Sequence, residues 1–384
     1  MAVRTVLVLG GGIGGVVAAT ELRKLLPAEH RVILIERSGH HVFWPSLLWL
    51  MTGTRKAKDV ARDFAPLERR GIEVVQGTIA AIDPSERAVV VGDRTICADA
   101  VVIALGAELV PEHVSGLAES GFNFFTTDGA ERLYAALQSV QGGRIVVLIA
   151  QTPFKCPAAP YEAAFLIDHY LRKHHLRQSV EVAVYAAEAA PMAVAGPTVS
   201  GAVVDLMAAR EIAYRPNERV LSVDPASQRL RFESGEEADY SLLAAVPPHR
   251  VPTVLQEAGL APEGGWVTVD RATCETPHSN VFAIGDATGI PLVMGKPLPK
   301  AGVFAHAQAE AVAHTVAARL LGQGAERTFT GHGECFLELG GGVAAFARGN
   351  FYAEPRPDVR LYRPGRHWHA AKVAFERAWW QRYF

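Results

Sequence analysis

The first 36 residues alternate two short apolar runs with a glycine-rich turn and a helical pattern. Residues 3–9 read VRTVLVL, a β-branched run typical of a buried parallel strand. The run leads directly into GGGIGG at 10–15, and the following VVAATELRKLL has helical spacing before a second apolar run, RVILIE. This order predicts a strand, a turn, a helix and a second strand, the start of a doubly wound α/β domain.

The glycines of this turn have the spacing of a dinucleotide-binding loop. Gly10, Gly12 and Gly15 satisfy GxGxxG. Such glycines permit a tight turn and a close approach of the backbone to a pyrophosphate at the positive end of the helix. Glu36 ends the second strand 21 residues beyond Gly15, about where an acid bonds a ribose hydroxyl. We therefore predict a dinucleotide site here.

Further along, the periodicity predicts a second α/β unit. Residues 144–150 and 180–186 read as strands, and 161–175 has helical spacing. The run RLRFES at 229–234, with the acid-rich turn after it, predicts a hairpin at the edge of this unit's sheet. From residue 367 the last helical pattern places an apolar stripe at Ala371, Ala374, Phe375 and Ala378.

Composition excludes several classes of protein. Of the 384 residues, 49% are hydrophobic and 20% charged, which excludes a disordered chain. The net charge of -2 argues against nucleic acid as a partner. Four cysteines are too few for a disulfide scaffold, and there is no apolar run long enough to span a bilayer. His40–His41 and His174–His175 read as loop and helix-end residues, so we predict no metal site.

Two later stretches resemble motifs of the glutathione reductase superfamily, whose members carry two dinucleotide-binding domains. NVFAIGDATGIP at 280–291 resembles its second flavin motif, with Gly285 and Asp286. There the acid reaches the ribityl chain and pyrophosphate of FAD. DAVVIALGAELVP at 99–111, with Gly106, resembles the turn where the chain leaves the FAD domain. The resemblance implies FAD as the cofactor.

The resemblance implies an α/β protein with two Rossmann-like domains of the glutathione reductase type and a C-terminal amphipathic extension. We expect a discontinuous FAD domain at 1–107 and 265–325. The second Rossmann-like domain would span 108–264 and carry the redox cysteine. Residues 326–384 would form a C-terminal region that contacts quinone and membrane.

The second domain lacks a nucleotide loop. Its first strand is followed by QTPFKCPAAPYE at 151–162, which has three prolines and no glycine. A nicotinamide dinucleotide needs backbone amides close to its pyrophosphate, and prolines cannot supply them. This loop argues against oxidation of NAD(P)H and places Cys156 where the glycines would be.

This substitution resembles sulfide:quinone oxidoreductases and the flavoprotein subunit of flavocytochrome c sulfide dehydrogenase. Five further stretches resemble the same family: FWPSLLWLMTGTRK, AAVPPHRVP, LPKAGVFAHAQAEAVA, ECFLELGGGVAAF and AKVAFE. The resemblance implies an enzyme that oxidises hydrosulfide to zero-valent sulfur or polysulfide. Electrons would leave through FAD to a membrane quinone. An alternative is a sulfide dehydrogenase subunit that passes electrons to a c-type cytochrome, and a further one is a flavin-bearing binding or sensor protein without catalysis.

By the same resemblance, Cys156 and Cys335 form the redox pair that receives hydrosulfide. We expect the helix start after Cys156 to lower the pKa of its thiol. Glu162 is either a base or proton carrier, or an acid that stabilises the helix dipole. Lys300 would lie near the flavin. Cys97 reads as core packing, and Cys274 has no role that the residues indicate.

The C-terminal helix carries the residues expected at the quinone. By resemblance Phe375 would stack on the quinone ring and Lys372 would bond or protonate a carbonyl oxygen. Trp379 and Trp380, beside basic side chains, suit a membrane interface, which predicts a peripheral membrane protein; the alternative is a helix packed on the protein's own core. Which side of the membrane it occupies and whether it forms a homo-oligomer stay open.

Two features of the family are missing. Its third cysteine falls near Phe125 and its histidine near Gly129, so a mechanism that uses either is not expected here. The segment HHVFWPSL has no cysteine to attach the flavin, so we expect noncovalent FAD.

Overall fold

A five-stranded parallel sheet holds the glycine-rich N-terminus. In the computed structural model, which describes residues 2–384, its strand order is β20-β9-β1-β2-β5. The strands are β20 (Val281–Ala283), β9 (Ala100–Ile103), β1 (Thr5–Leu9), β2 (Arg31–Glu36) and β5 (Glu73–Gln76). All four pairings are parallel. Because β20 pairs with β9, the chain returns to this sheet after building a second unit.

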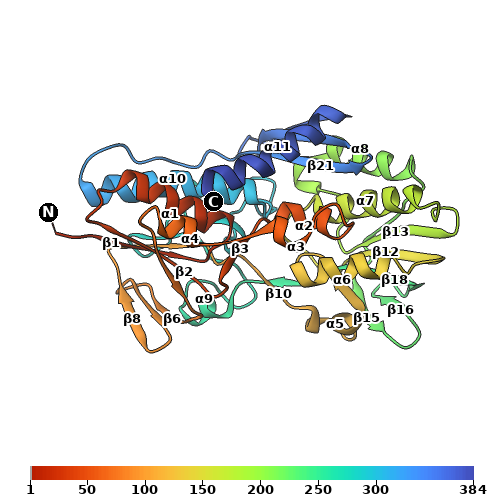
Figure 1. The fold of residues 1–384 in the computed structure, drawn as a ribbon, viewed down its shortest axis with the longest axis horizontal. Helices are drawn as coiled ribbons and strands as arrows, with labels where there is room; N and C mark the ends of the chain where they lie inside the picture. Colours follow the sequence, from red (N-terminus) through yellow and green to blue (C-terminus); the bar gives the residue numbers. More distant parts are fainter. Residues whose placement is uncertain (1) are drawn as a thin grey trace.

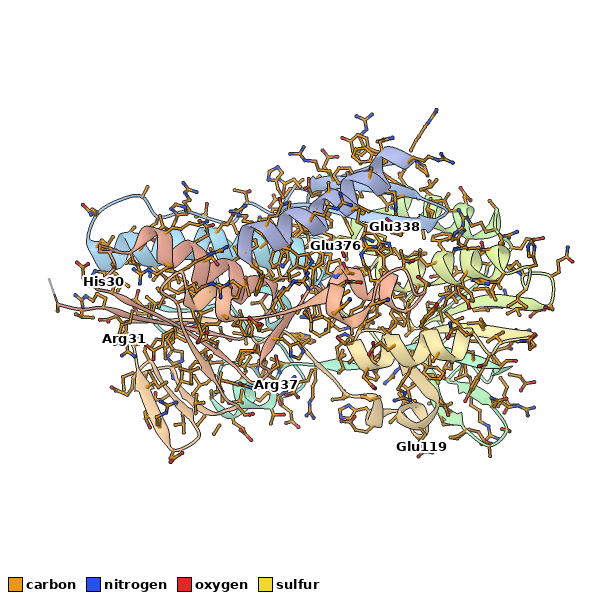
Figure 2. All side chains as sticks on the ribbon, in the orientation of Figure 1. His30, Arg31, Arg37, Glu119, Glu338 and Glu376 are labelled. Atoms are coloured by element: carbon orange, nitrogen blue, oxygen red, sulfur yellow. The ribbon has the colours of Figure 1, made fainter. Side chains whose placement is uncertain are left out.

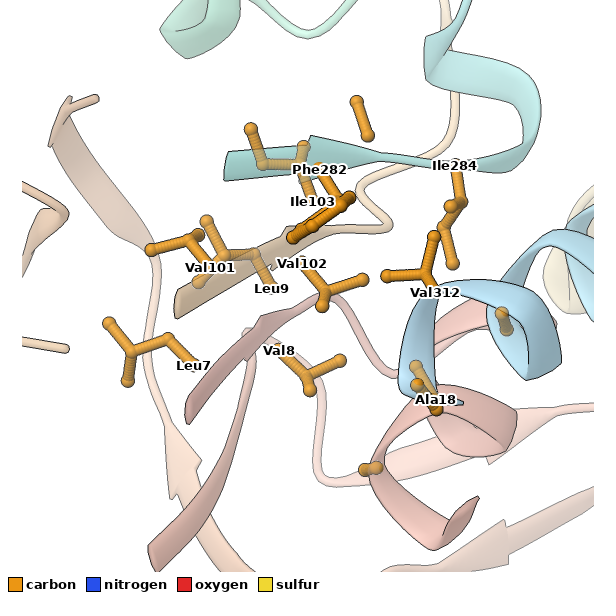
Figure 3. Close-up of a cluster of buried hydrophobic side chains, with 14 of the residues drawn as sticks. Leu7, Val8, Leu9, Ala18, Val101, Val102, Ile103, Phe282, Ile284 and Val312 are labelled. Atoms are coloured by element: carbon orange, nitrogen blue, oxygen red, sulfur yellow. The ribbon is translucent and has the colours of Figure 1, made fainter. Parts of the chain in front are cut away.

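Two helices cover one face of this sheet. They are α1 (Ile13–Leu25) and α10 (Gly302–Leu321), which lie side by side in Figure 1. Figure 3 shows Val8, Val102 and Val312 meeting between the strands and these helices, and all three are fully buried. The continuous apolar strands seen in the sequence follow from this burial on both faces.

Smaller elements complete the first unit. An antiparallel sheet is formed by β6 (Ile79–Asp83), β7 (Ala88–Val91) and β8 (Arg94–Cys97), and α9 (Thr253–Glu257) packs against β6. The other short elements are β3 (His40–Val42), β4 (Ala61–Asp63), α2 (Leu47–Leu50), α3 (Ala57–Val60) and α4 (Ala65–Glu68). The expectation that Cys97 packs in the core is wrong, because it ends the outer strand β8 and is exposed.

A second parallel sheet forms the other α/β unit, on the right in Figure 1. Its order is β11-β18-β12-β13-β14. The strands are β11 (Gly121–Asn123), β18 (Leu242–Val246), β12 (Gly143–Ile149), β13 (Val180–Ala186) and β14 (Ala213–Pro216). Its helices are α5 (Leu117–Ser120), α6 (Thr127–Leu137), α7 (Ala159–Lys173) and α8 (Pro197–Ala208). The two-stranded ladder of β10 (Glu108–Leu109) and β19 (His249–Arg250) lies where the chain passes between the units.

The hairpin predicted at 229–234 forms, but not at the edge of this sheet. β15 (Val220–Asp224), β16 (Arg229–Phe232) and β17 (Glu237–Asp239) make a separate antiparallel sheet. Leu230 and Phe232 are buried against strand residues of the parallel sheet, and the Phe232 ring stacks on Tyr185 at 4.9 Å. The apolar side of the hairpin therefore covers a face of the parallel sheet rather than extending its edge.

The C-terminal region joins both units. Strands β21 (His332–Gly340), β22 (Val343–Asn350) and β23 (Asp358–Gly365) form an antiparallel sheet, and α11 (Arg366–Tyr383) follows. β21 packs on α7 of the second unit, whereas α11 contacts β22 and also α1 of the first. Figure 1 shows α11 running across the top of the molecule above both units. None of the helices described between residues 2 and 384 is long and apolar enough to cross a membrane.

Candidate functional site

The glycine loop after β1 has room for a ligand at one position and no room for side chains at two others. A Cβ at Gly15 would lie 1.7 Å from the Gly10 carbonyl oxygen, and Gly10 itself has a φ of +101°. By contrast, a Cβ at Gly12 would meet no atom within 4 Å. Gly12 begins α1 as its N-cap, so open space lies at the positive end of this helix. The loop therefore fits a pyrophosphate.

Glu36 is fixed beside this loop. Its Oε2 accepts a hydrogen bond from the Gly11 amide at 2.6 Å, and its Oε1 accepts from the Ser38 amide at 2.9 Å. The carboxylate thus lies at the carboxyl end of β2 and faces the glycine loop. Gly106 follows β9 at the same sheet edge, with a φ of +67°. Ligands of doubly wound sheets bind at this edge, so both residues are placed for a nucleotide.

Asp286 presents a buried polar atom that has no partner. It lies in the short turn Gly285–Ala287 after β20, and its Oδ1 accepts no hydrogen bond from the part of the chain that the structure describes. Burial raises the pKa of this carboxyl, while the ammonium groups of Lys155 and Lys300 act in the opposite direction. A buried acceptor without a donor is costly unless a ligand supplies one. This acid therefore fits the hydroxyl groups of a bound dinucleotide.

Lys300 lies directly against this acid. Its Nζ donates to the carbonyl oxygens of Asp286 at 2.7 Å and Thr288 at 3.0 Å, and lies 3.2 Å from the centre of the Trp266 ring. Burial lowers the pKa of Lys300 to about 7. Its backbone also contacts the cysteine loop, because the Cys156 amide donates to the Lys300 carbonyl at 2.6 Å. The flavin motif and the cysteine loop are therefore physically joined.

Cys156 lies between β12 and α7 in a left-handed conformation, with φ of +51°. Its side chain is half-buried. Burial, and next the Glu162 carboxylate, raise the pKa of its thiol to about 12, and the Lys372 ammonium only partly offsets them. The expectation of a lowered pKa is wrong here, because loss of solvent and a buried acid outweigh the helix N-terminus.

Cys335 is brought to the same place from β21, although it is 179 residues away in sequence. Its Sγ donates to the Phe336 carbonyl at 3.3 Å. Burial raises the pKa of this thiol, and the charges of Cys156 and Glu162 raise it further. The two cysteines are therefore within electrostatic reach of each other and of one acid. Both are free thiols in this structure.

Glu162 forms a buried ion pair. Lys372 Nζ donates to its Oε1 at 2.6 Å, and the Glu338 amide donates to the same oxygen at 2.9 Å. Burial acts to lower the pKa of Lys372, but the carboxylates of Glu162 and Glu338 raise it overall. Glu162 lies in the first turn of α7, and its carboxylate is held by α11 and β21. Glu162 therefore does more than stabilise the helix dipole of α7, because it also binds groups from α11 and β21.

The sequence reasoning missed Glu338 and His369, which continue this buried network. His369 Nδ1 lies 2.9 Å from Glu338 Oε1. Glu338 is buried, and burial raises the pKa of its carboxyl. His369 stands one helical turn before Lys372 on α11. The three-residue spacing of His369 and Lys372 could be read from the sequence and places both on one face of a helix. The acid that His369 contacts, Glu338, lies on β21 and could not be found from this spacing.

Phe375 and Trp379 occupy different faces of α11. The Phe375 side chain is 43% exposed, with its ring 5.6 Å from that of Phe43. Trp379 is 3% exposed. Its predicted place at a membrane interface is therefore wrong, because it packs on the protein's own core. Ala374 and Ala378 of the expected stripe are exposed beside Phe375, so this stripe faces outward.

Trp379 is held by a histidine that the sequence reasoning assigned to a loop. His41 lies in β3 and is buried. Its Nδ1 lies 2.8 Å from the Gly11 carbonyl oxygen, and its Nε2 accepts from Trp379 Nε1 at 3.1 Å. Burial lowers the pKa of His41 to about 4. The neutral ring thus connects the glycine loop to the C-terminal helix.

A second histidine that the sequence reasoning missed lies near the cysteine loop. His249, in β19, is buried, and within residues 2–384 its Nε2 has no hydrogen-bond partner. Its ring meets that of Phe125 edge-on at 5.9 Å. Phe125 fills the position where the family's third cysteine was expected. No three His, Cys, Asp or Glu side chains of the described chain gather as a metal site would require.

Comparisons with known proteins agree with this geometry. The profile of the family described as pyridine nucleotide-disulphide oxidoreductase matches residues 4–311. A mitochondrial sulfide:quinone oxidoreductase of Mus musculus is 27% identical over 364 residues, which cover 91% of this chain and 79% of that protein. A sulfide-quinone reductase of Aquifex aeolicus is 27% identical, over 97% of this chain and 89% of its own. The crystal structure of the sulfide:quinone oxidoreductase from Aquifex aeolicus superposes with a TM-score of 0.88, covering 98% of this chain and 90% of that one.

Proposed function

Because this chain belongs to the pyridine nucleotide-disulphide oxidoreductase family, and its two site cysteines share one buried acid, we propose that it is a sulfide:quinone oxidoreductase. It oxidises hydrosulfide to zero-valent sulfur or polysulfide and passes two electrons to a quinone. The single observation that carries this proposal is the meeting of Cys156 and Cys335 beside Glu162 and Lys372.

FAD is the cofactor of this family. In this chain the glycine loop, Glu36 and Gly106 would hold its nucleotide half, and Gly285 with Asp286 would hold the ribityl chain. Bound FAD would accept two electrons from the sulfur site and deliver them to the quinone. We assign its site to residues 1–107 and 265–325, because the parallel sheet of the first unit draws strands from both segments.

The cysteine pair would receive the sulfur. In the oxidised protein a sulfur atom would bridge Cys156 and Cys335. Hydrosulfide would attack this bridge, which would break one S–S bond and leave a persulfide on one cysteine and a thiolate on the other. This thiolate would pass two electrons to bound FAD. With both thiols raised in pKa, a base is needed to keep a cysteine in the reactive thiolate form. Glu162 is the buried acid nearest in sequence to Cys156, and its charge acts on both thiols. We therefore give Glu162 the role of proton carrier.

The quinone would bind at α11. Phe375 offers an exposed aromatic ring beside Phe43, and Lys372 supplies an ammonium group within the same helix. Trp44, which follows Phe43 in the chain, is also exposed. A membrane surface that covers these groups would bring the lipid-soluble quinone to them. The proposed localisation is thus peripheral at a membrane.

One experiment separates this function from pyridine nucleotide oxidation. The purified yellow protein is mixed anaerobically with sulfide, and separately with NADH, while flavin absorbance is followed. We expect sulfide to bleach the flavin and NADH to leave it oxidised, because the loop 151–162 lacks glycines. Bleaching by NADH and not by sulfide would overturn the proposal. Fast reduction of cytochrome c with no quinone turnover would instead favour a cytochrome-linked sulfide dehydrogenase.

A further inference from the structure

A string of buried ionisable side chains runs from the cysteine pair to the surface of α11. Its members are Glu162, Lys372, Glu338 and His369. The side chains of Glu162 and Lys372 are only 3% and 6% exposed, and that of Glu338 only 1%. His369 is the outer end, with a side chain 31% exposed. It lines a surface hollow together with Arg377 and Gln381 of the same helix.

Short contacts join Lys372 to Glu162 and His369 to Glu338, and the charge of the Glu338 carboxylate acts on the Lys372 ammonium. Glu162 Oε1 accepts from both Lys372 Nζ and the backbone amide of Glu338. The Glu338 carboxylate in turn lies 2.9 and 3.1 Å from His369 Nδ1. Trp49, itself buried, closes one side of the string, with the Lys372 ammonium 5.2 Å from its ring centre and the His369 ring meeting it edge-on at 6.0 Å. Figure 2 labels Glu338 beside the C-terminal helix.

Burial of these ionisable side chains does not by itself explain the stability of the folded protein. Removing several ionisable groups from water costs free energy that their mutual attraction only partly returns, and apolar side chains of similar size often do as well. A partly exposed histidine that is bonded through Nδ1 to a buried acid can take a proton from solvent on one nitrogen and release one from the other.

We propose that His369 and Glu338 carry protons from solvent to Lys372 for reduction of the quinone. This inference rests on the proposed function. The reaction of hydrosulfide, quinone and one added proton gives zero-valent sulfur and quinol. Hydrosulfide loses two electrons and its own proton, and the quinone gains two electrons and two protons. One proton per turnover must therefore enter from solvent.

The path moves that proton without net change in the protein. Lys372 gives a proton to a quinone oxygen and becomes neutral. His369 takes a proton from solvent at Nε2 and passes its Nδ1 proton to the Glu338 carboxylate. Glu338 then reprotonates Lys372, and exchange with solvent restores the original tautomer of His369. The carboxylate of Glu162 keeps Lys372 charged between turnovers.

The test separates the two halves of the reaction. The holoprotein is first reduced anaerobically with sulfide in a stopped-flow instrument, and the reduced protein is then mixed with a short-chain quinone. We expect His369→Gln to keep the rate of reduction by sulfide within about twofold and to slow reoxidation by quinone roughly tenfold or more, as loss of an acid–base group does. Added imidazole should restore much of the lost rate.

Matched variants make the outcome specific. His367→Gln removes another histidine of α11, exposed and without a carboxylate partner in the described chain, and should reoxidise at the wild-type rate. Glu338→Gln should slow reoxidation as His369→Gln does, but imidazole should not rescue it because the inner acid is lost. Normal reoxidation of His369→Gln would overturn the relay, and so would a slow rate that imidazole does not restore. If sulfide fails to bleach the wild-type flavin, the proposed function itself is wrong.

Discussion

Trp379 donates its indole N–H to Nε2 of His41 across 3.1 Å, and the other nitrogen of that ring lies 2.8 Å from the Gly11 carbonyl oxygen. The C-terminal helix is therefore bonded, through one neutral histidine, to the loop that would hold the FAD pyrophosphate. The Phe384 ring stacks on the same histidine at 5.0 Å. Docking of α11 and order of the glycine loop thus depend on each other.

Trp379→Phe tests this connection. The substitution keeps an aromatic ring but leaves the buried Nε2 of His41 without a donor, which should cost about 1–3 kcal/mol of unfolding free energy. Urea unfolding followed by circular dichroism measures it. Trp368→Phe is the control, because Trp368 stacks on Phe346 and its indole N–H has no hydrogen-bond partner in the described chain. Equal stability of the two variants would contradict the role of the hydrogen bond.

The pH dependence of stability should report His41. Its pKa is about 4 in the folded protein and near 6.5 when unfolded, so the unfolded chain binds more protons between these values. The stabilisation by neutral His41 is therefore complete above pH 6.5 and is lost as the pH falls towards 4. Wild type should lose up to about 3 kcal/mol more than His41→Asn over this range. Parallel pH profiles of unfolding free energy for the two proteins would refute this.

Asp286→Ala should yield largely colourless protein. The buried Oδ1 that has no partner among the described residues would be lost, and FAD affinity should fall by roughly a hundredfold, about 2.7 kcal/mol. The ratio of flavin to protein absorbance measures the occupancy. Asp270→Ala is the control, because that acid caps an exposed turn. A fully flavinated Asp286 variant would contradict the assignment.

Cys156→Ser and Cys335→Ser should each retain FAD but lose reduction by sulfide by roughly a thousandfold or more, as loss of a covalent nucleophile does. Stopped-flow measurement of flavin bleaching gives the rate. Cys97→Ser is the matched control, since that exposed thiol ends β8 and should not affect the rate. A near wild-type rate in either site variant would exclude the paired-sulfur mechanism.

Lys372→Met should be costly because it leaves Glu162 buried and uncompensated. Breaking one side of a buried ion pair costs about 3–5 kcal/mol. Glu162→Gln combined with Lys372→Met should cost less than Lys372→Met alone, because no charge is stranded. Arg144→Met, which breaks an exposed pair with Glu181, should cost less than about 1 kcal/mol. Thermal unfolding of the wild type and of these three variants tests these expectations.

Deletion of residues 367–384 would not test quinone binding alone, because it would also remove Lys372 from Glu162 and Trp379 from His41. Phe375→Ala is the sharper variant, since the Phe375 side chain is 43% exposed and forms neither of these contacts. We expect its stability to stay within about 0.5–1 kcal/mol of wild type and the KM for a short-chain quinone to rise roughly tenfold. An unchanged KM for quinone would show that quinone binds away from Phe375.

The sequence alone determined the features that depend on neighbouring residues. The glycine spacing at 10–15 and the acid at Glu36 could be read directly, because strand, turn and helix signals are local. The flavin motif at 280–291 and the loop around Cys156 were identified by their resemblance to known families. The order of these motifs was enough to predict the fold class, which the structure and the family match confirm.

Only the tertiary structure decided how α11 faces the protein. Its apolar stripe predicted either a face for quinone and membrane or a helix packed on the protein's own core; the stripe is exposed at Ala374 and Phe375, whereas Lys372 and Glu376 are buried. They can be buried because Glu162 and Arg55, from distant elements, bond them at 2.6 Å. A helical pattern shows which side chains are polar, but it does not show which oppositely charged groups other elements of the fold place beside them. For the same reason the pKa of Cys156 could not be foreseen, since burial and Glu162 together outweigh the local helix start.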